Sequence, residues 1–275
     1  MKYIVFIIIG ILFYQSSWGQ RKISLPFSSS YDENATILLG IQYNVVSQSY
    51  QLQLTDGWQN LDIDFGDNDA NTLGELRSIQ SKPNIGFSVG IPVDIRANDN
   101  MYFTFNPSFL FFNGIGIEYS SIDNSKPALI RRQRHIMSST DGTNFNAFEF
   151  PLSFKFRSDE KILKNKFNRY RAYLIGGARY TRWIGIDGEY KELLNSNNPT
   201  SIPQSLIMKS GYLSWEAGFG ADIFFAYFKM SPEIKFNQSF GNVFAPNHEL
   251  ARDNKFMAPI EKGFIRNIYL SLIFQ

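Results

Sequence analysis

The sequence contains no cysteine and only two histidines among its 275 residues. The absence of cysteine excludes a disulfide framework, a thiol nucleophile and a lipid-modified N-terminal cysteine. Charged residues make up only 19% of the chain, whereas roughly a quarter is usual for a soluble domain. The formal net charge of +2 gives no reason to expect a nucleic-acid partner.

Long apolar runs are missing after the N-terminus, so the rest of the chain has no candidate for a transmembrane helix. At the N-terminus, Lys2 precedes an apolar run at 4–14, and the small residues Ser17 and Gly19 follow it. This order predicts a signal peptide over 1–19, because the apolar run is shorter than the ~20 residues of a spanning helix. We expect residues 20–35 to form a polar periplasmic lead-in and residues 36–275 to form one domain.

Aromatic residues are abundant, at 16% of the chain, and they alternate with polar residues. Between 228 and 240, one set of alternate positions holds Phe228, Met230, Pro232, Ile234, Phe236 and Phe240. The other set holds Lys229, Ser231, Glu233, Lys235, Asn237 and Ser239. In a strand these two sets point to opposite faces, one apolar and one charged.

The same alternation predicts eight strands, at 36–46, 84–96, 101–119, 146–157, 169–184, 211–224, 228–242 and the C-terminal segment. Long polar connections follow the odd strands and shorter ones follow the even strands. This pattern predicts an all-β fold: an eight-stranded antiparallel transmembrane β-barrel of OmpX/OmpA-like architecture in the cell outer membrane. The long loops would be extracellular, and the short turns and both termini periplasmic. A soluble sandwich or a lipocalin-like barrel would explain neither the alternating connection lengths nor polar residues on the enclosed face.

An eight-stranded barrel is only wide enough for its own side chains, so a conducting pore is not expected. Buried charges need partners, and the inward positions supply similar numbers of both signs. The expected lumen network consists of Asp94, Arg96, Glu118, Glu149, Lys155, Arg157, Arg171, Arg179, Glu216, Asp222, Lys229, Glu233 and Lys235. The outward Tyr119, Tyr180, Trp183 and Trp215 are expected to form an interfacial aromatic belt.

Enzymatic motifs are incomplete, so we expect no catalytic residue and no cofactor. His248 and Glu249 begin an H-E-x-x-H motif, but Arg252 stands in the place of the second histidine. Gly218 and Gly220 resemble the start of a dinucleotide loop that lacks its third glycine.

Two charged clusters in expected loops could bind ligands. Four acidic residues could hold Ca²⁺ through oxygen ligands, although they lack EF-hand spacing: Asp62, Asp64, Asp67 and Asp69. Four basic residues could contact lipopolysaccharide phosphates or an acidic partner: Lys126, Arg131, Arg132 and Arg134. The alternative for each cluster is an ordinary solvated loop.

Three segments carry a resemblance to a known family: EFPLSFKFRS at 149–158, YRAYLIGGARY at 170–180 and ADIFFAYFKMSPEIKFNQSFGNV at 221–243. They resemble the PorT/SprT family, outer-membrane proteins of Bacteroidetes linked to type IX secretion and gliding motility. The resemblance covers most of 84–275 and is most specific at YFKMSPEIKF. It implies a non-enzymatic barrel that contacts other type IX secretion components and outer-membrane lipid. The family supplies no catalytic residues to carry over.

Two other functions stay open on the sequence alone. One is an OmpX-like surface barrel that acts as an adhesin or membrane stabiliser. The other, less expected, is a lipid-modifying barrel enzyme. Secretion defects, adhesion defects and an altered lipid A mass spectrum would distinguish the three functions.

Overall fold

The computed structural model describes residues 23–24, 35–61, 73–132, 145–162, 169–195, 206–252 and 254–275. The expected signal peptide, most of the lead-in, Arg134 and the four loop aspartates lie outside the described residues. Among the described residues, no helix is both long enough and apolar enough to cross a membrane.

The described strands form two sheets, one of them the three-stranded β10-β9-β4, and together they make a barrel wall of eight strands, several of which consist of more than one segment. The first four strands are β2 (Ile37–Leu39) with β3 (Ile41–Leu54); β4 (Leu76–Lys82) with β5 (Asn84–Gly90) and β6 (Val93–Arg96); β7 (Met101–Phe105) with β8 (Ser108–Phe111) and β9 (Gly116–Ser121); and β10 (Leu129–Arg132) with β11 (Ala147–Arg157). The last four are β13 (Arg169–Trp183), β14 (Gly211–Phe224), β15 (Lys229–Ser239) and β16 (Ile260–Phe274). Short elements complete the set: β1 (Ile23–Ser24), β12 (Lys161–Ile162), α2 (Ile186–Asn195) and 3-10 turns at Trp58–Asn60 and Glu249–Ala251.

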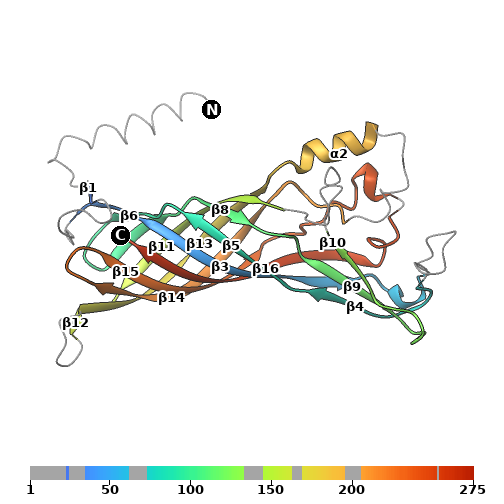
Figure 1. Cartoon of the computed structure of the whole chain (residues 1–275), viewed down its shortest axis with the longest axis horizontal. Helices are drawn as coiled ribbons and strands as arrows, with labels where there is room; N and C mark the ends of the chain where they lie inside the picture. Colours follow the sequence, from blue (N-terminus) through green and yellow to red (C-terminus); the bar gives the residue numbers. More distant parts are fainter. Residues whose placement is uncertain are drawn as a thin grey trace.

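The wall closes on itself because the last strand pairs with the first. β16 runs antiparallel to β3 from Phe274 opposite Ile41 to Ile260 opposite Leu54, with one register shift between Ile260 and Lys262. Each remaining wall strand pairs antiparallel with its neighbour in the chain, including β11 with β13 and β14 with β15. The expected eight-stranded antiparallel barrel is therefore confirmed. In Figure 1 the C-terminus lies at one end with the turns before β7, β13 and β15, and the long connections lie at the other. We call these the turn end and the loop end.

The outer surface of the wall carries a continuous apolar belt. The exposed residues of this belt include Tyr43, Val45, Ile85, Phe87, Phe148, Phe154, Leu174, Phe219, Ile268 and Leu270. A contiguous apolar surface of this extent is unfavourable in water. The barrel is thus built to face lipid on its outside, which is the arrangement of the transmembrane β-barrel class.

Toward the loop end, the polar and apolar residues of the strands exchange faces: polar residues point outward and apolar residues point inward. In the first half of β3, Gln42 is buried and Tyr43 is exposed; near its end, Tyr50 is buried, while Gln51 and Gln53 are exposed. The period of two is unchanged, but the apolar side chains now point inward. This reversal is expected where a wall leaves lipid and enters water, because water then favours polar groups on the outside.

Above the belt, the ends of the strands and their connections form a compact structure that we call the dome. It comprises β4, β9, β10, α2 and residues 206–210, 240–252 and 254–259. The long polar connection expected between the strands at 36–46 and 84–96 is partly strand, because β3 continues to Leu54 and β4 begins at Leu76. The expected 185–210 loop contains α2, whose buried Ile186, Tyr190 and Leu193 face inward. Figure 1 shows α2 at the loop end, beyond the wall.

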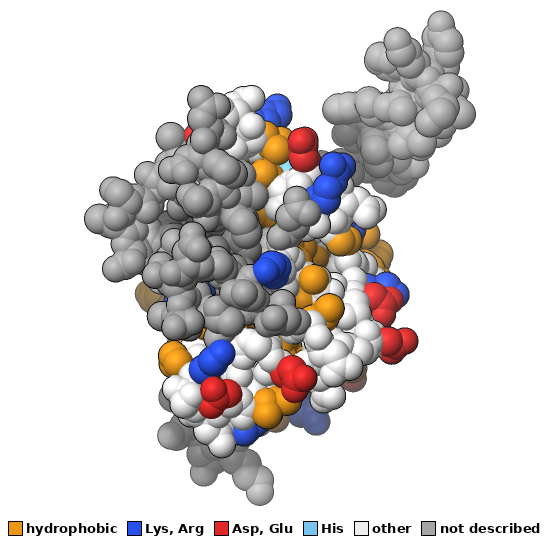
Figure 2. Space-filling model, turned by 90° about the vertical axis from the view of Figure 1, so that its right-hand side faces the viewer, with side chains coloured by type: hydrophobic (Ala, Val, Ile, Leu, Met, Phe, Trp, Pro, Cys, Tyr) orange, Lys and Arg blue, Asp and Glu red, His pale blue; other side chains and the backbone are white. Residues whose placement is uncertain are grey.

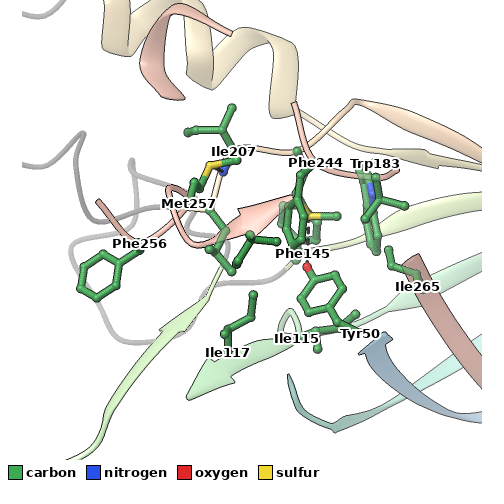
Figure 3. Close-up of a cluster of buried hydrophobic side chains, with 14 of the residues drawn as sticks. Tyr50, Ile115, Ile117, Phe145, Trp183, Ile207, Phe244, Phe256, Met257 and Ile265 are labelled. Carbon is green, nitrogen blue, oxygen red and sulfur yellow. Dashed lines mark hydrogen bonds between the residues drawn. The ribbon is translucent and has the colours of Figure 1, made fainter. Parts of the chain in front are cut away.

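The dome has its own hydrophobic core, formed by side chains from widely separated connections (Figure 3). Trp183 lies with its ring centroid 4.4 Å from that of Phe145. The phenol of Tyr119 donates a hydrogen bond of 2.6 Å to the carbonyl of Phe256, whose ring it also contacts. The core therefore seals the loop end of the barrel from within.

Two members of the expected aromatic belt were assigned wrongly. Tyr119 is fully buried and Trp183 is 2% exposed, so both belong to the dome core. Leu110 and Phe112 point inward on even positions, but Ile117 and Tyr119 point inward on odd positions. Gly114, with a φ of 78°, lies between the two pairs and allows the change of phase.

Tryptophan quenching can test this division between belt and dome. In lipid vesicles with brominated acyl chains, we expect strong quenching of Trp215, which is 37% exposed on the belt, and little of Trp183. The measurement needs two variants that each keep one of these tryptophans, with Phe replacing the other and Trp58. Equal quenching of the two would contradict the placement of Trp183 inside the dome.

Candidate functional site

The interior of the barrel holds a buried, charge-balanced set of side chains. Ten of the thirteen charges expected there are no more than 4% exposed. The acids are Asp94, Glu149, Glu216, Asp222 and Glu233, and the bases are Lys155, Arg157, Arg179, Lys229 and Lys235. Five negative groups thus face five positive groups away from water.

Arg179 is the centre of the part nearest the dome. Its guanidinium lies 2.9 Å from Glu149 and 2.7 Å from Glu216. It also lies 4.0 Å from the centre of the Tyr269 ring, and the Tyr269 hydroxyl donates a 2.6 Å hydrogen bond to Glu149. Ser153 donates a 2.6 Å hydrogen bond to the carboxylate of Glu216. Hydrogen bonds and opposite charge together make burial of these groups tolerable.

A second group of charges lies nearer the turn end. Asp94 is 2.8 Å from Lys155 and 3.7 Å from Lys229. Asp222 is 3.2 Å from Arg157 and 3.8 Å from Lys229, so this lysine bridges the two acids. The group spans strands β6, β11, β14 and β15, and it therefore ties opposite parts of the wall together.

A third pair joins these two groups. Glu233 lies 2.8 Å from Lys235 and accepts a 3.0 Å hydrogen bond from Tyr173. Lys235 is also 3.9 Å from Glu216, and Lys155 lies 4.7 Å from the centre of the Tyr173 ring. The charges consequently form one connected network along the barrel axis.

The turn end is closed by backbone and aromatic contacts. Lys229 and Gln275 exchange backbone hydrogen bonds of 2.6 and 2.9 Å, and Gln275 is 1% exposed. Arg157 lies 4.7 Å from the Tyr102 ring centre and 5.6 Å from that of Phe224. Together with the dome core at the other end, these contacts suit a filled barrel better than a conducting one.

Three residues expected in the lumen lie elsewhere. Arg96 pairs with Asp99 at the turn end, where it reaches water. Arg171 lies 3.8 Å from Glu160 and donates to the carbonyl of Asp99 there. These strand ends extend past the interior, so their charges are solvated rather than enclosed.

Glu118 is the third residue that lies outside the lumen, and the reason is different. The change of phase near Gly114 turns its side chain outward, where it pairs with Lys82 at 2.9 Å. An uninterrupted alternation would have placed the Glu118 side chain inside the barrel. In the sequence, the interruption is marked by Gly114, which follows Asn113.

Of the basic residues expected to bind lipopolysaccharide, the three that the structure describes are not gathered on one face, and Arg134 lies outside the described residues. Arg131 lies over the Phe256 ring at 4.4 Å, against the dome core, whereas Arg132 is exposed on the opposite face of β10. Lys126 lies in a turn in which Ser125 donates two hydrogen bonds to Asp123. Those bonds hold the pKa of Asp123 below its ordinary value.

No metal-binding cluster of His, Asp and Glu occurs among the described residues. His248 accepts a 3.2 Å hydrogen bond on Nδ1 from the backbone of Leu250, so it caps the turn at Glu249–Ala251. The partial H-E-x-x-H motif therefore contributes to local structure in the dome.

The ion pair of Glu233 and Lys235 can be used to test whether the network stabilises the barrel. We expect Glu233→Leu to lower the free energy of unfolding by about 1–3 kcal/mol, because it leaves Lys235 and Tyr173 without their nearest acceptor. The loss is limited because Lys235 keeps Glu216 at 3.9 Å. The matched variant Glu249→Leu changes an exposed acid and should shift stability by less than about 0.5 kcal/mol. Equal urea midpoints in detergent would contradict the role of Glu233.

The comparisons with known proteins add a fold likeness and no family. No protein-family model matches the chain, and no curated protein matches it. Among solved structures, Neisserial surface protein A (NspA) shares 9% identity, with 86% of this chain and 94% of that chain covered and a TM-score of 0.38. Ail, the attachment invasion locus protein of Yersinia pestis, shares 7% identity over 86% and 96% of the two chains, with a TM-score of 0.28. Its complex with the heparin analogue sucrose octasulfate gives 10% identity, 86% and 96% coverage and a TM-score of 0.27. At these values the likenesses carry no argument about function.

Proposed function

We propose that the chain is an integral protein of the cell outer membrane that acts at the surface through its dome, as an adhesin or membrane stabiliser. The supporting observation is the filled interior: a connected network of ten buried charges lies between a sealed loop end and a sealed turn end. Conduction has no suitable path in such a barrel. Contacts made by exposed surfaces are what this architecture offers.

The orientation of the dome is part of the proposal. Long connections on one side of an outer-membrane barrel are extracellular, and short turns are periplasmic. By this rule the dome faces the medium and both termini face the periplasm. The apolar belt contacts outer-membrane lipid, and the exposed polar face of β4 and β9 lies in water.

Epitope tags at the two ends test this orientation. A tag placed after Asn247, an exposed residue of the dome, should bind antibody on intact cells. A tag after Asp159, between β11 and β13 at the turn end, should bind only after the outer membrane is permeabilised. The reverse pattern would overturn the proposed orientation, and loss of adhesion in a deletion strain would support a role at the surface.

A second candidate function is an accessory role in type IX secretion, through contacts with other secretion components. Its support is the PorT/SprT resemblance, whose three segments fall on β11, β13 and the pair β14–β15. These strands are consecutive neighbours in the wall, so the resembling segments make one continuous surface. A contact with a partner in the membrane would need such a surface.

The culture-medium proteome of a deletion strain distinguishes the two functions. If proteins with type IX C-terminal signals leave the medium and accumulate in the periplasm, the secretion role is supported. If the secreted proteins are unchanged and adhesion is altered, the surface role is supported. A changed lipid A mass spectrum alone would instead favour a lipid-modifying enzyme.

A further inference from the structure

A groove crosses the surface of the dome between α2 and the segment 242–248. Two adjoining hollows of about 380 and 440 Å³ make it up, and they share Lys209, Ala245 and His248 as lining residues. One hollow extends along α2 past Lys191, and the other extends toward Asn247. Figure 2 views the molecule from this end and shows basic, acidic and hydrophobic side chains mixed on its surface.

The groove is rich in hydrogen-bond donors. Lys191 and Lys209 are exposed ammonium groups, and Lys209 uses one proton to donate to the carbonyl of Asn242 at 2.7 Å. The Nδ1 atom of His248 accepts from the backbone of Leu250, so in the neutral ring the proton is on Nε2. The Asn247 amide adds further donors.

The groove offers few free acceptors. Among the described residues that line it, the one acid is Asp187, which is paired with Arg182; Arg182 also donates to Ser210 at 2.7 Å. The phenol oxygen of Tyr190 accepts a 2.8 Å hydrogen bond from the backbone of Met208, and burial raises the pKa of Tyr190 above its ordinary value. A donor-rich surface with two lysines is complementary to an anion with several acceptor oxygens.

The aromatic side chains that line the groove lie mostly beneath its surface. Tyr190, Phe244 and Met208 are 8%, 2% and 1% exposed, so they form the underlying core rather than a contact surface. Peptide partners are bound mainly through buried apolar or aromatic anchors. Among the described lining residues the exposed apolar side chains are Leu194, at 42% exposure, and Pro246, and they line different hollows. A sugar polymer needs no apolar pocket, because its hydroxyl and acidic groups are matched by polar side chains.

We propose that this groove binds an acidic glycan, with Lys191 and Lys209 contacting carboxylate or sulfate groups and His248 and Asn247 donating to sugar oxygens. The proposal rests on the proposed exposure of the dome to the medium. It names the ligand class of that surface.

Binding is tested with the purified full-length mature protein in detergent micelles. The probes are an oligogalacturonate, which carries carboxylates, dextran sulfate, which carries sulfates, and neutral dextran. Calorimetry at low and high salt should show binding of at least one acidic glycan, no binding of neutral dextran and weaker binding at high salt. The double variant Lys191→Gln/Lys209→Gln should weaken that binding at least about tenfold, since two charge-assisted contacts are lost.

Matched controls keep the result specific to the groove. Lys161→Gln/Lys262→Gln removes two exposed lysines at other places and should leave the dissociation constant unchanged. Equal loss in both double variants, equal binding of polyglutamate, or no binding of either acidic glycan would overturn the proposal. Because the measurement uses purified protein, the proposed surface function can fail in cells while binding persists, and binding can fail while the tags confirm the orientation.

Discussion

Replacing Arg179 with leucine should destabilise the barrel more than any other single change to its charges. The variant leaves Glu149 and Glu216 buried without the guanidinium that lies within 2.9 Å of both. Removal of one partner from a buried ion pair costs about 3–5 kcal/mol; here Glu149 loses the cation beside it, and Glu216 keeps only Lys235, at 3.9 Å. Reversible urea unfolding in lipid vesicles, followed by fluorescence, should show this loss.

Arg182→Leu is the matched control, because it lies three residues away on the same strand. Its side chain is 44% exposed and pairs with the exposed Asp187. Exposed pairs contribute at most about 1 kcal/mol, so the unfolding midpoint should change little. If the two variants had the same midpoint, the interior network would not be a source of stability. Restoration of the wild-type midpoint in a triple variant with Glu149→Gln and Glu216→Gln would show that unpaired charge causes the loss.

The barrel could be predicted from sequence because lipid and a narrow interior impose opposite demands on alternate residues. In β15, for example, Ile234 and Phe236 face lipid while Glu233 and Lys235 are enclosed, and a period of two expresses that difference directly. The range 211–224 matched β14 at both ends. Ten of the thirteen candidate interior charges are buried for the same reason, since a charge on the lipid face would be costly.

The dome could not be predicted in the same way. Its strands keep the two-residue alternation of apolar and polar side chains, but the medium outside the wall changes from lipid to water. YQLQL at 50–54 alternates as regularly as the residues before it, yet Tyr50 lies on the enclosed face and Gln51 on the water-exposed face. The signal is present as the replacement of apolar residues, such as Tyr43 and Val45, by glutamine at outward positions. Trp183 and Tyr119 carry no such signal, because an aromatic residue suits a membrane interface and a dome core equally well. Their placement depends on contacts with distant connections.

The largest effect of a single substitution is expected at Gly177. This glycine of β13 is opposite Ser153 of β11. A Cβ atom there would meet the carbonyl oxygen of Leu152 and the Cα of Ser153, which are backbone atoms and cannot move independently of the wall. We expect Gly177→Val to prevent β11 and β13 from pairing. An open barrel has two unpaired edges in lipid, each with costly unsatisfied backbone groups, so the folded form should be lost.

Gly176→Val provides the control at the adjacent position. Its Cβ points outward, and the nearest atom is the Glu216 carbonyl oxygen at 3.7 Å, an ordinary contact distance. The folded fraction can be measured by the different gel migration of unheated and heated protein after refolding into micelles. Gly176→Val should fold like the wild type, whereas Gly177→Val should show no folded band. Normal folding of Gly177→Val would mean that the two strands can separate without loss of closure, and the close approach of β11 and β13 would then not be a requirement of this barrel.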